Sequence, residues 1–198
     1  MIAELTRNSL VYRLWQSPFA EQKFAPVARV LSTHRPRSVL DVGCGPGTNA
    51  GHFRDVQYVG LDVEEAYIHS ARRRFGDRFV LGDATRALPL EGAPYDFILL
   101  NSLMHHLDDG QVGAVLGQAA DVLAPGGAIH ILDLELPDER GLPRFLAKHD
   151  RGDFPRRREA WQMLLGSSLR LEAFEPYALT VGRHALWRMF YCHGAVGG

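Results

Sequence analysis

Runs of consecutive apolar residues alternate along this chain with segments whose apolar residues recur at helical spacing. Five apolar runs predict buried strands, at residues 37–42, 56–62, 78–83, 95–100 and 128–136. Helices are predicted between them, from the loop at 43–47 through about Phe53, at 63–76 and at 108–123. Alternating strands and helices at this spacing predict βαβ units, and therefore a parallel sheet covered by helices on both faces.

The pattern changes after Leu136. Residues 137–167 are rich in proline, glycine and charge around an amphipathic helix, "REAWQMLLG", and we expect them to form an insertion or lid. Two strand-like segments, "LRLEAFEP" and "HALWRMFYCH", predict a closing β-hairpin within 168–198. Residues 1–34 are expected to form a helical cap of two short helices ahead of a core at 37–136.

Composition narrows the class of protein. The chain has 198 residues, 46% of them hydrophobic and 23% charged, which fits a single soluble domain over 1–198. A net charge of −1 gives no basic field for nucleic acid or a membrane surface. Two cysteines make no disulfide framework, and neither a signal peptide nor a run of eighteen apolar residues is visible. We therefore expect a cytoplasmic monomer or homodimer.

Three glycines follow the first predicted strand at alternate positions: Gly43, Gly45 and Gly47. Ligands of an open parallel sheet bind outside the carboxyl ends of its strands, which is where this loop falls. A phosphate-binding loop of the Walker type needs a Lys-Ser/Thr pair, and none follows Gly47. A dinucleotide fingerprint needs its third glycine where Thr48 stands. The loop therefore favours a ligand with adenosine and no pyrophosphate.

Acidic residues end the next two strands. Asp62 can accept hydrogen bonds from both ribose hydroxyls, and Asp83 can accept one from an exocyclic amine such as that of adenine. A glycine turn, a ribose acid and an adenine acid in chain order are a far more specific signal than the glycines alone.

The chain resembles the class I S-adenosylmethionine-dependent methyltransferases in five stretches, "VLDVGCGPGTNA", "YVGLDVEEAYIHSARRRF", "GDA", "YDFILLNSLMHHLDD" and "VLAPGGAIHILD". The resemblance covers about residues 37–136 tightly and continues more loosely through "DRGDF" and the terminal hairpin. It implies a Rossmann-like, doubly wound α/β sheet of seven strands, mostly parallel with an antiparallel C-terminal strand. It also implies S-adenosylmethionine as the cofactor, but no motif in the set fixes the methyl acceptor.

The resemblance also implies roles for single positions. The three glycines would let the backbone approach the methionine part of the cofactor beside the Asp41 carboxylate, and Asn101 would flank the sulfonium. The implied cofactor-binding positions are Asp41, Gly43, Gly45, Gly47, Asp62, Val63, Asp83, Ala84 and Asn101.

Two histidines follow the fourth strand, where acceptor and methyl group should meet. A neutral histidine takes up a proton near pH 7. A hydroxyl acceptor would need such a base, and we expect it at His106, with His105 and Asp133 as lesser candidates. A carbon, sulfur or already deprotonated nucleophile would need none, and the histidines would then only shape the turn. No metal site is expected, because no ligands stand at convincing spacing.

Further side chains are candidates for substrate or cofactor contacts. For each of them the alternative is an ordinary residue of the hydrophobic core or of the solvent-exposed surface. The arginine run could bind an anionic acceptor, and aromatic residues could line the pocket. A charged cluster in the insertion could act as a lid, and three polar residues near the N-terminus could close over the methionine carboxylate of the cofactor. These candidates are Arg156, Arg157 and Arg158; Trp15, Phe19, Trp161 and Trp187; His149, Asp150 and Arg151; and Tyr12, Arg13 and Gln16.

The near-neutral charge favours a small-molecule acceptor, for example in O-methylation within a polysaccharide or natural-product pathway. Three alternatives stay open: a protein or tRNA methyltransferase, a non-methylating catalyst on the same fold, and a cofactor-binding partner subunit.

Overall fold

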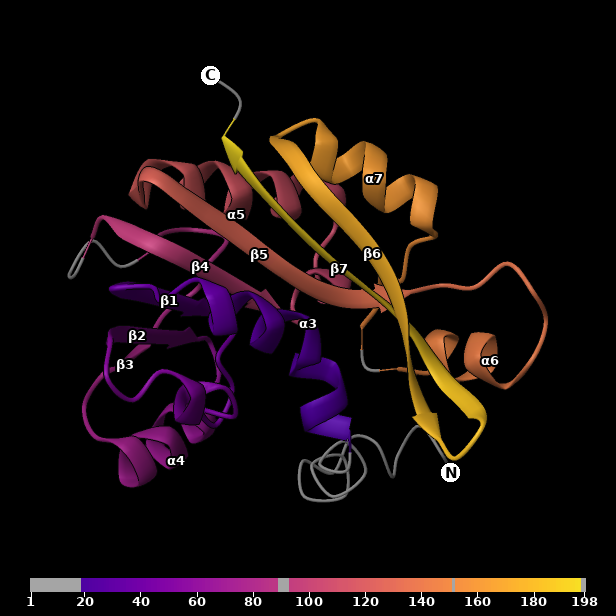
Figure 1. Cartoon of the computed structure of the whole chain (residues 1–198), viewed down its shortest axis with the longest axis horizontal. Helices are drawn as coiled ribbons and strands as arrows, with labels where there is room; N and C mark the ends of the chain where they lie inside the picture. The colour runs from indigo at the N-terminus through magenta and orange to yellow at the C-terminus, as the bar shows by residue number, and fades with distance from the viewer. Residues whose placement is uncertain (1–18, 89–92, 151, 197–198) are drawn as a thin grey trace.

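A computed structural model describes residues 19–88, 93–150 and 152–196 of the chain (Figure 1). In chain order the elements are α3 (Ala20–Thr33), β1 (Ser38–Val42), the 3₁₀ helix η2 (Ala50–His52), β2 (Gln57–Asp62), α4 (Glu65–Phe75), β3 (Phe79–Leu81), β4 (Tyr95–Asn101), the 3₁₀ helix η3 (Met104–His106), α5 (Asp109–Val122), β5 (Leu123–Glu135), α6 (Leu142–Lys148), α7 (Arg158–Gly166), β6 (Leu169–Val181) and β7 (His184–Val196). The first helix expected in 1–34, with Tyr12, Arg13, Trp15 and Gln16, lies outside the described residues, and so does Arg151.

All seven strands form one sheet, in the order β3-β2-β1-β4-β5-β7-β6. The pairs among β1 to β5 are parallel, whereas β7 runs antiparallel to both β5 and β6. The predicted seven-stranded, mostly parallel α/β sheet with its antiparallel last strand is therefore confirmed. The predicted hairpin is confirmed as well, with Gly182 at a φ of +56° in the turn between β6 and β7.

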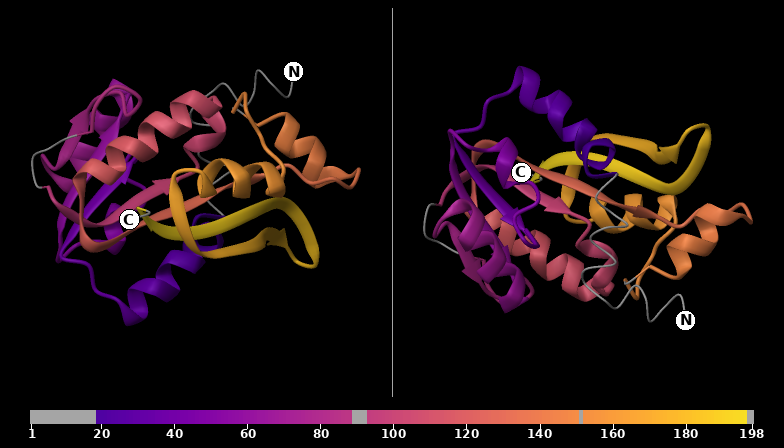
Figure 2. Two further views of the ribbon diagram at one scale, coloured as in Figure 1. Left: turned by 90° about the horizontal axis from the view of Figure 1, so that it is seen from above. Right: turned by 90° about the horizontal axis from the view of Figure 1, so that it is seen from below.

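Helices cover both faces of the sheet, as the consecutive apolar runs predict. Successive side chains of a strand point to opposite faces, so Ile98 and Leu100 of β4 pack with α5 and α7, and Phe97 and Leu99 pack with α3 and α4. Figure 2 shows α5 and α3 on opposite sides of the strands. A third cluster joins α6 to the C-terminal hairpin.

The helix boundaries follow local signals where these are strong. Asp108 caps α5, because its carboxylate accepts from the backbone N–H of Gln111 while the Gln111 side chain accepts from the backbone N–H of Asp108. Gly76 ends α4 at a φ of +85°, a backbone conformation that favours glycine. In the segment 137–167, Trp161 and Leu165 of α7 are fully buried in the core.

Two elements differ from the expectation. The predicted helix after the glycine loop is only the single 3₁₀ turn η2, since "GPGTNAGHF" contains three glycines and a proline, which oppose a helix. Strand β5 begins at Leu123, five residues before Ala128, and its pairing with β4 shifts register between Tyr95 and Phe97. None of the described helices is both long and apolar enough to cross a membrane.

Candidate active site

The carboxyl ends of β1, β2 and β4 meet at one edge of the sheet. β1 lies between β2 and β4, so the strand order reverses at β1 and the chain leaves the sheet in opposite directions on the two sides. This is the place where open α/β sheets bind their ligands.

The glycine loop lies at that reversal. Gly43, Gly45 and Gly47 adopt φ angles of +74°, +55° and +77°, which explains why all three positions lack a side chain. A Cβ atom on Gly47 would lie 3.0 Å from the Phe75 ring, whereas one on Gly45 would meet nothing within 4 Å. The loop is thus packed against the protein at Gly47 and open at Gly45.

Asp62 holds the loop in place. Its Oδ2 accepts from the backbone N–H of Gly45 at 2.8 Å, and its Oδ1 accepts from that of Glu64 at 2.9 Å. Burial raises the pKa of Asp62, and these two backbone donors oppose the rise. A carboxylate offers about four lone-pair positions, so both oxygens keep acceptor capacity for a ligand. The next residue, Val63, is 71% exposed, which is unusual for a large apolar side chain.

Asp41 lies in the interior instead of at the edge of the loop. Its Oδ2 accepts from the Tyr58 hydroxyl at 2.8 Å and from Asn49 Nδ2 at 3.2 Å. Asn101 Nδ2 donates to Asn49 Oδ1 at 3.2 Å, which links the two predicted site residues Asp41 and Asn101 through one amide. Burial raises the pKa of Asp41 to about 6. Its Oδ1 has no hydrogen-bond partner among the residues that the structure describes.

Asp83 stabilises its own turn. Its Oδ1 accepts from the Thr85 hydroxyl at 2.7 Å and from the Thr85 backbone N–H at 2.9 Å, and these bonds lower the pKa of Asp83. Its Oδ2 pairs with Arg86 at 3.3 Å. Ala84 accepts a hydrogen bond from Gln118 Nε2 through its carbonyl at 3.1 Å. Both residues follow β3, next to the end of β2.

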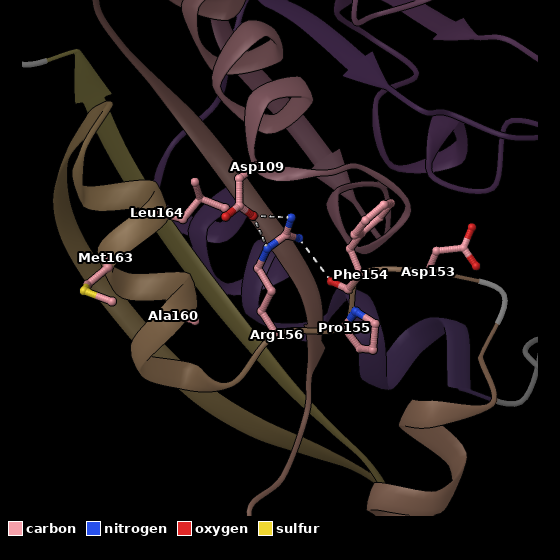
Figure 3. Close-up of a pocket in the computed structure, with 8 residues that line it drawn as sticks. All are labelled: Asp109, Asp153, Phe154, Pro155, Arg156, Ala160, Met163 and Leu164. Atoms are coloured by element: carbon pink, nitrogen blue, oxygen red, sulfur yellow. Dashed lines mark hydrogen bonds and ion pairs between the residues drawn. The ribbon is translucent and has the colours of Figure 1, made fainter.

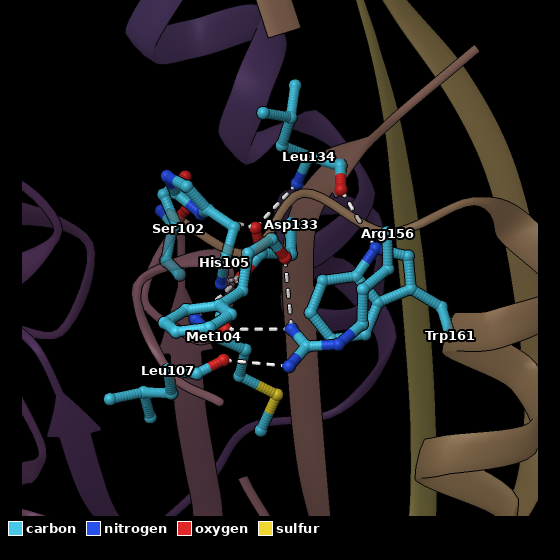
Figure 4. Close-up of polar contacts among 10 residues, drawn as sticks. Ser102, Met104, His105, Leu107, Asp133, Leu134, Arg156 and Trp161 are labelled. Atoms are coloured by element: carbon cyan, nitrogen blue, oxygen red, sulfur yellow. Dashed lines mark hydrogen bonds and ion pairs between the residues drawn. The ribbon is translucent and has the colours of Figure 1, made fainter. Parts of the chain in front are cut away.

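A buried histidine–aspartate pair lies between β4 and β5 (Figure 4). His105 Nδ1 is 2.6 Å from Asp133 Oδ1, and Asp133 Oδ2 accepts from the backbone N–H of Met104 at 2.8 Å. Burial alone would raise the pKa of Asp133, but His105 and the backbone donors of Leu134 and Met104 hold it below its usual range. Burial likewise disfavours the His105 imidazolium, yet Asp133 and Asp150 outweigh it and raise the pKa of His105.

The two histidines face different surroundings. His105 is 2% exposed, and its Nε2 is buried with no hydrogen-bond partner within the described ranges. His106 is exposed, and its ring centroid lies 4.2 Å from that of His105. The two adjacent histidines of η3 therefore differ in burial: His105 lies in the interior and His106 is exposed to solvent.

A small pocket, which we call the His105 pocket, opens beside this pair. Polar groups from four separate segments meet apolar side chains of β5 and the C-terminal hairpin; the lining residues are Lys23, Ser102, His105, Leu134, Asp150, Leu179, Trp187 and Met189. Burial lowers the pKa of Lys23, and the charges of Asp150 and Asp133 oppose this. Ser102, directly after β4, has a φ of +57°, a strained backbone conformation for a serine.

Of the aromatic residues considered for the acceptor pocket, some line a pocket and others lie in the hydrophobic core. Trp187 lines the His105 pocket, and Phe19 packs edge-to-face against it with ring centroids 5.4 Å apart. Trp161 is fully buried, and its Nε1 donates to the carbonyl of Leu134 at 2.9 Å. Trp161 is thus a satisfied core residue.

Arg156 is engaged on every side (Figure 3). Its Nε donates to Asp109 Oδ1 at 2.8 Å, its Nη2 donates to the Leu107 carbonyl at 2.8 Å, and its guanidinium lies 4.7 Å from the Trp161 ring centroid. Arg156 Nη1 also donates to the carbonyls of Phe154 at 3.1 Å and Met104 at 3.3 Å. An open hollow of about 600 Å³ lies beside Arg156, between the start of α5 and α7.

The other two arginines of the run are also paired. Arg157 lies 2.9 Å from Asp138, and Arg158 makes a bidentate pair with Glu135 at 3.0 Å for both bonds. None of the three lines the His105 pocket. The arginine run therefore holds the 137–167 segment to the core of the protein.

Comparison with known proteins agrees with this geometry. Residues 39–127 match the family model of a methyltransferase domain. A trans-aconitate 2-methyltransferase from Methylobacterium radiotolerans is 35% identical over 63% of this chain and 48% of its own length. An O-methyltransferase, resE, from Aspergillus sclerotiorum is 28% identical over 66% of this chain and 57% of its own length. The chain spans about half the length of the curated relatives it matches.

Solved structures share the fold. The PH0226 protein from Pyrococcus horikoshii aligns with a TM-score of 0.69 at 21% identity, over 96% of this chain and 93% of that one. The mitomycin 7-O-methyltransferase MmcR aligns with a TM-score of 0.67 at 18% identity, over 97% of this chain and 60% of that one. Residues 39–127 thus match a methyltransferase domain, and the fold is shared with solved methyltransferases, which agrees with the resemblance to the class I S-adenosylmethionine-dependent methyltransferases. The predicted resemblance and the predicted cofactor are confirmed.

The described site fits S-adenosylmethionine. The cofactor carries an ammonium group, and the buried Oδ1 of Asp41, which has no hydrogen-bond partner within the described ranges, is a suitable acceptor for it. The open space at Gly45 leaves room for a ligand against the backbone, and Asp62 keeps acceptor capacity for two hydroxyls. Among the described residues, no group of three or more His, Cys, Asp or Glu side chains could hold a metal ion.

Sequence reasoning missed two features of the methyltransferase site. Lys23 lines the His105 pocket from α3, and its signal was a lysine placed among the inward-facing residues Phe24 and Val27 of an amphipathic helix. Asn49 bridges Asp41 and Asn101, and no sequence signal marks an asparagine in a glycine-rich loop as structural.

Proposed function

We propose that this methyltransferase transfers the methyl group of S-adenosylmethionine to a hydroxyl oxygen of a small, uncharged molecule bound in the His105 pocket. One observation carries the proposal: the buried Nε2 of His105 faces no protein partner in the described chain, while Asp133 holds Nδ1 at 2.6 Å. A histidine oriented in this way is built to take a proton from a bound ligand.

The cofactor contacts expected from the sequence belong to this proposal. Asp62 accepts from the ribose hydroxyls, Asp41 Oδ1 accepts from the ammonium of the methionine part, and the exposed Val63 gives an apolar surface to a flat ring. Asp83 and Ala84, beside the end of β2, receive the adenine. Gly43, Gly45 and Gly47 supply the close backbone approach, and Asn101 lies at the reacting end.

S-adenosylmethionine supplies an electrophilic methyl group on a sulfonium that leaves in line with the attacking oxygen. His105 accepts the hydroxyl proton at Nε2 as the oxygen attacks, and Asp133 stabilises the imidazolium through Nδ1–H. The pocket walls hold the acceptor close to the methyl group, which supplies much of the rate in a displacement of this kind. We place the base at His105 and not at His106, because His106 is exposed.

Charge in the His105 pocket favours an uncharged acceptor. Of the lining residues in the described chain, Lys23 is cationic and Asp150 anionic, and Asp133 adds a second carboxylate directly behind His105. A polyanion would meet both carboxylates with one ammonium to balance them. Leu134 and Trp187 give the pocket an apolar wall, and its cavity of about 10 Å³ has room for the hydroxyl end of an acceptor only.

The relatives support an oxygen acceptor, since resE is named an O-methyltransferase. Another relative is named for trans-aconitate, an anionic substrate, and the two carboxylates at the His105 pocket argue against that substrate here. The proposal therefore commits to a neutral hydroxyl.

The test is transfer of isotopically labelled methyl from S-adenosylmethionine into extracts divided into small metabolites, protein and RNA. We expect the label in small metabolites, and in a panel of phenols and alcohols in preference to trans-aconitate. Label confined to protein or RNA would replace the proposal with a macromolecular methyltransferase. Cofactor binding without any transfer would indicate a non-methylating catalyst or a partner subunit.

A further inference from the structure

A short segment after α6, residues 152–156, crosses the turn that carries His105; we call it the strap. The backbone N–H of Phe154 donates to the His105 carbonyl at 2.9 Å. Arg156 donates to the Leu107 carbonyl at 2.8 Å and to the Met104 carbonyl at 3.3 Å (Figure 4). The strap therefore donates to two carbonyls of η3 and to that of Leu107 directly after it, and a short turn leaves most such carbonyls without a partner of its own.

Gly152, at the start of the strap, lies directly against the imidazole ring. A Cβ atom on Gly152 would lie 2.1 Å from Cδ2 of His105 and 2.5 Å from the His105 carbonyl oxygen, both too short for any side chain. Gly152 is buried and its φ is not positive, so contact with His105 and not backbone conformation requires the glycine.

The two contacts act on opposite edges of one ring. Asp133 holds Nδ1, and the Gly152 backbone abuts Cδ2, which is across the ring from Nδ1. With both edges in contact, the ring is held in place, and Nε2 is its one polar atom without a hydrogen-bond partner in the described part of the chain. His105 lines the His105 pocket together with Lys23 of α3 and Asp150 just before the strap.

We propose that Gly152 is a positioning residue for His105: the missing side chain lets the strap clamp the imidazole against Asp133 with Nε2 directed into the His105 pocket. The proposal rests on the function proposed above, in which His105 is the base. It assigns a role to the "DRGDF" stretch that neither the cofactor site nor the acceptor contacts explain. A side chain at position 152 would overlap Cδ2 and the carbonyl oxygen of His105, so the ring could not keep its present place and would lose both its tautomer and its direction.

The test compares Gly152→Ala with Gly117→Ala, a control on α5 where a Cβ atom meets nothing within 4 Å. The first readout is an NMR titration of the His105 imidazole, which needs no acceptor. The charged and titratable groups around this ring are Asp133 of β5, Asp150, Lys23 and the neighbouring His106, whose ring centroid is 4.2 Å away. Since Asp133 raises the pKa of His105, we expect Gly152→Ala to lower that pKa and to mix the two neutral tautomers, while Gly117→Ala changes neither.

The second readout is methyl transfer to the acceptor found above. We expect Gly152→Ala to lower kcat at least tenfold and to shift the pH–rate profile, with unchanged affinity for S-adenosylhomocysteine. A folded Gly152→Ala protein with the wild-type His105 titration, or one with wild-type kcat, would overturn the proposal. If that variant does not fold, Arg156→Lys carries the test, because lysine cannot make both carbonyl contacts; an unchanged His105 titration then overturns it. Failure of the proposed function would show separately, as absent transfer by the wild-type protein.

Discussion

His105 and Asp133 form a buried pair in which Nδ1 lies 2.6 Å from Oδ1, although 27 residues separate them in the chain. β4 and β5 bring them together, because the turn after β4 faces the carboxyl half of β5. The neighbouring His106 lies on the surface and has a different environment. This contrast between adjacent histidines allows their roles to be separated by experiment.

The first prediction compares His105→Asn with His106→Asn. With a hydroxyl acceptor, His105→Asn should lower kcat by about 10² to 10⁴, the usual contribution of a general base. It should also remove the increase in rate that accompanies rising pH as the base loses its proton. That increase reflects loss of the His105 proton, so its midpoint should lie above the ordinary histidine pKa. His106→Asn should keep the rate within a few-fold. A larger loss of kcat in His106→Asn than in His105→Asn would indicate that His106 is the base.

The second prediction concerns pH and cofactor binding. Burial raises the pKa of Asp41 to about 6, whereas the ammonium group of the cofactor needs the ionised carboxylate. Affinity for S-adenosylhomocysteine should therefore be constant above about pH 7 and should fall as pH drops below 6, by up to tenfold per unit. Calorimetry between pH 5 and 8 measures this. Asp41→Asn should bind more weakly and lose the pH dependence; a variant that keeps it would assign the titration to another group.

A third prediction separates two glycines of one loop. Both have positive φ, so alanine at either costs about 1 kcal/mol of stability or more. At Gly47 the new Cβ also meets Phe75 and Phe79, so Gly47→Ala should mainly lower the denaturation midpoint. At Gly45 the Cβ enters the open space of the site, so Gly45→Ala should mainly weaken cofactor binding. Equal losses of affinity in two folded variants would contradict this division.

A fourth prediction lies away from the site. His130 is 3% exposed, stacks on Phe97 and is bound to the Tyr191 hydroxyl at 2.9 Å, and burial lowers its pKa to about 3. The unfolded chain therefore takes up a proton near pH 6.5 that the native chain refuses. Stability should fall as pH drops from about 6.5 toward 3, by up to about 1.4 kcal/mol per unit from this group.

Urea unfolding at several pH values checks this slope. His130→Gln removes the titrating group and should flatten the dependence between pH 6 and 4 relative to the wild type. A variant with the same slope as the wild type would show that carboxylates alone set the acid stability.

The sequence was sufficient for the sheet because each strand obeys a local rule. β1 and β4 are largely buried and mostly apolar in sequence. The glycine loop follows the carboxyl end of β1, and the acidic positions Asp62 and Asp83 lie at the carboxyl ends of β2 and β3. The helix expected after Gly47 was wrong, since the left-handed glycines and Pro46 leave only η2. The pattern of apolar residues in this stretch does not distinguish a full helix from a single 3₁₀ turn.

The choice between two adjacent histidines was beyond sequence reasoning. The orientation of His105 depends on Asp133, which lies on the neighbouring strand β5. It also depends on the strap, whose Gly152 is 47 residues from His105 in the chain. The arginine run misled for a similar reason: a charged run usually faces solvent, yet the Arg156 side chain is only 10% exposed beside Trp161. Long-range contacts decide both cases.

The measurement that tests the account most directly is calorimetric titration of the wild-type chain and of Asp62→Asn with S-adenosylhomocysteine. Asp77→Asn serves as the control, since Asp77 is exposed and precedes β3 at the opposite edge of the sheet. Hydrogen bonds to a charged group are worth about 1.5 to 3 kcal/mol, so Asp62→Asn should weaken binding about ten- to a hundredfold per bond lost, and Asp77→Asn should not. Wild-type protein that binds neither S-adenosylhomocysteine nor S-adenosylmethionine, and binds a nicotinamide dinucleotide instead, would contradict the account.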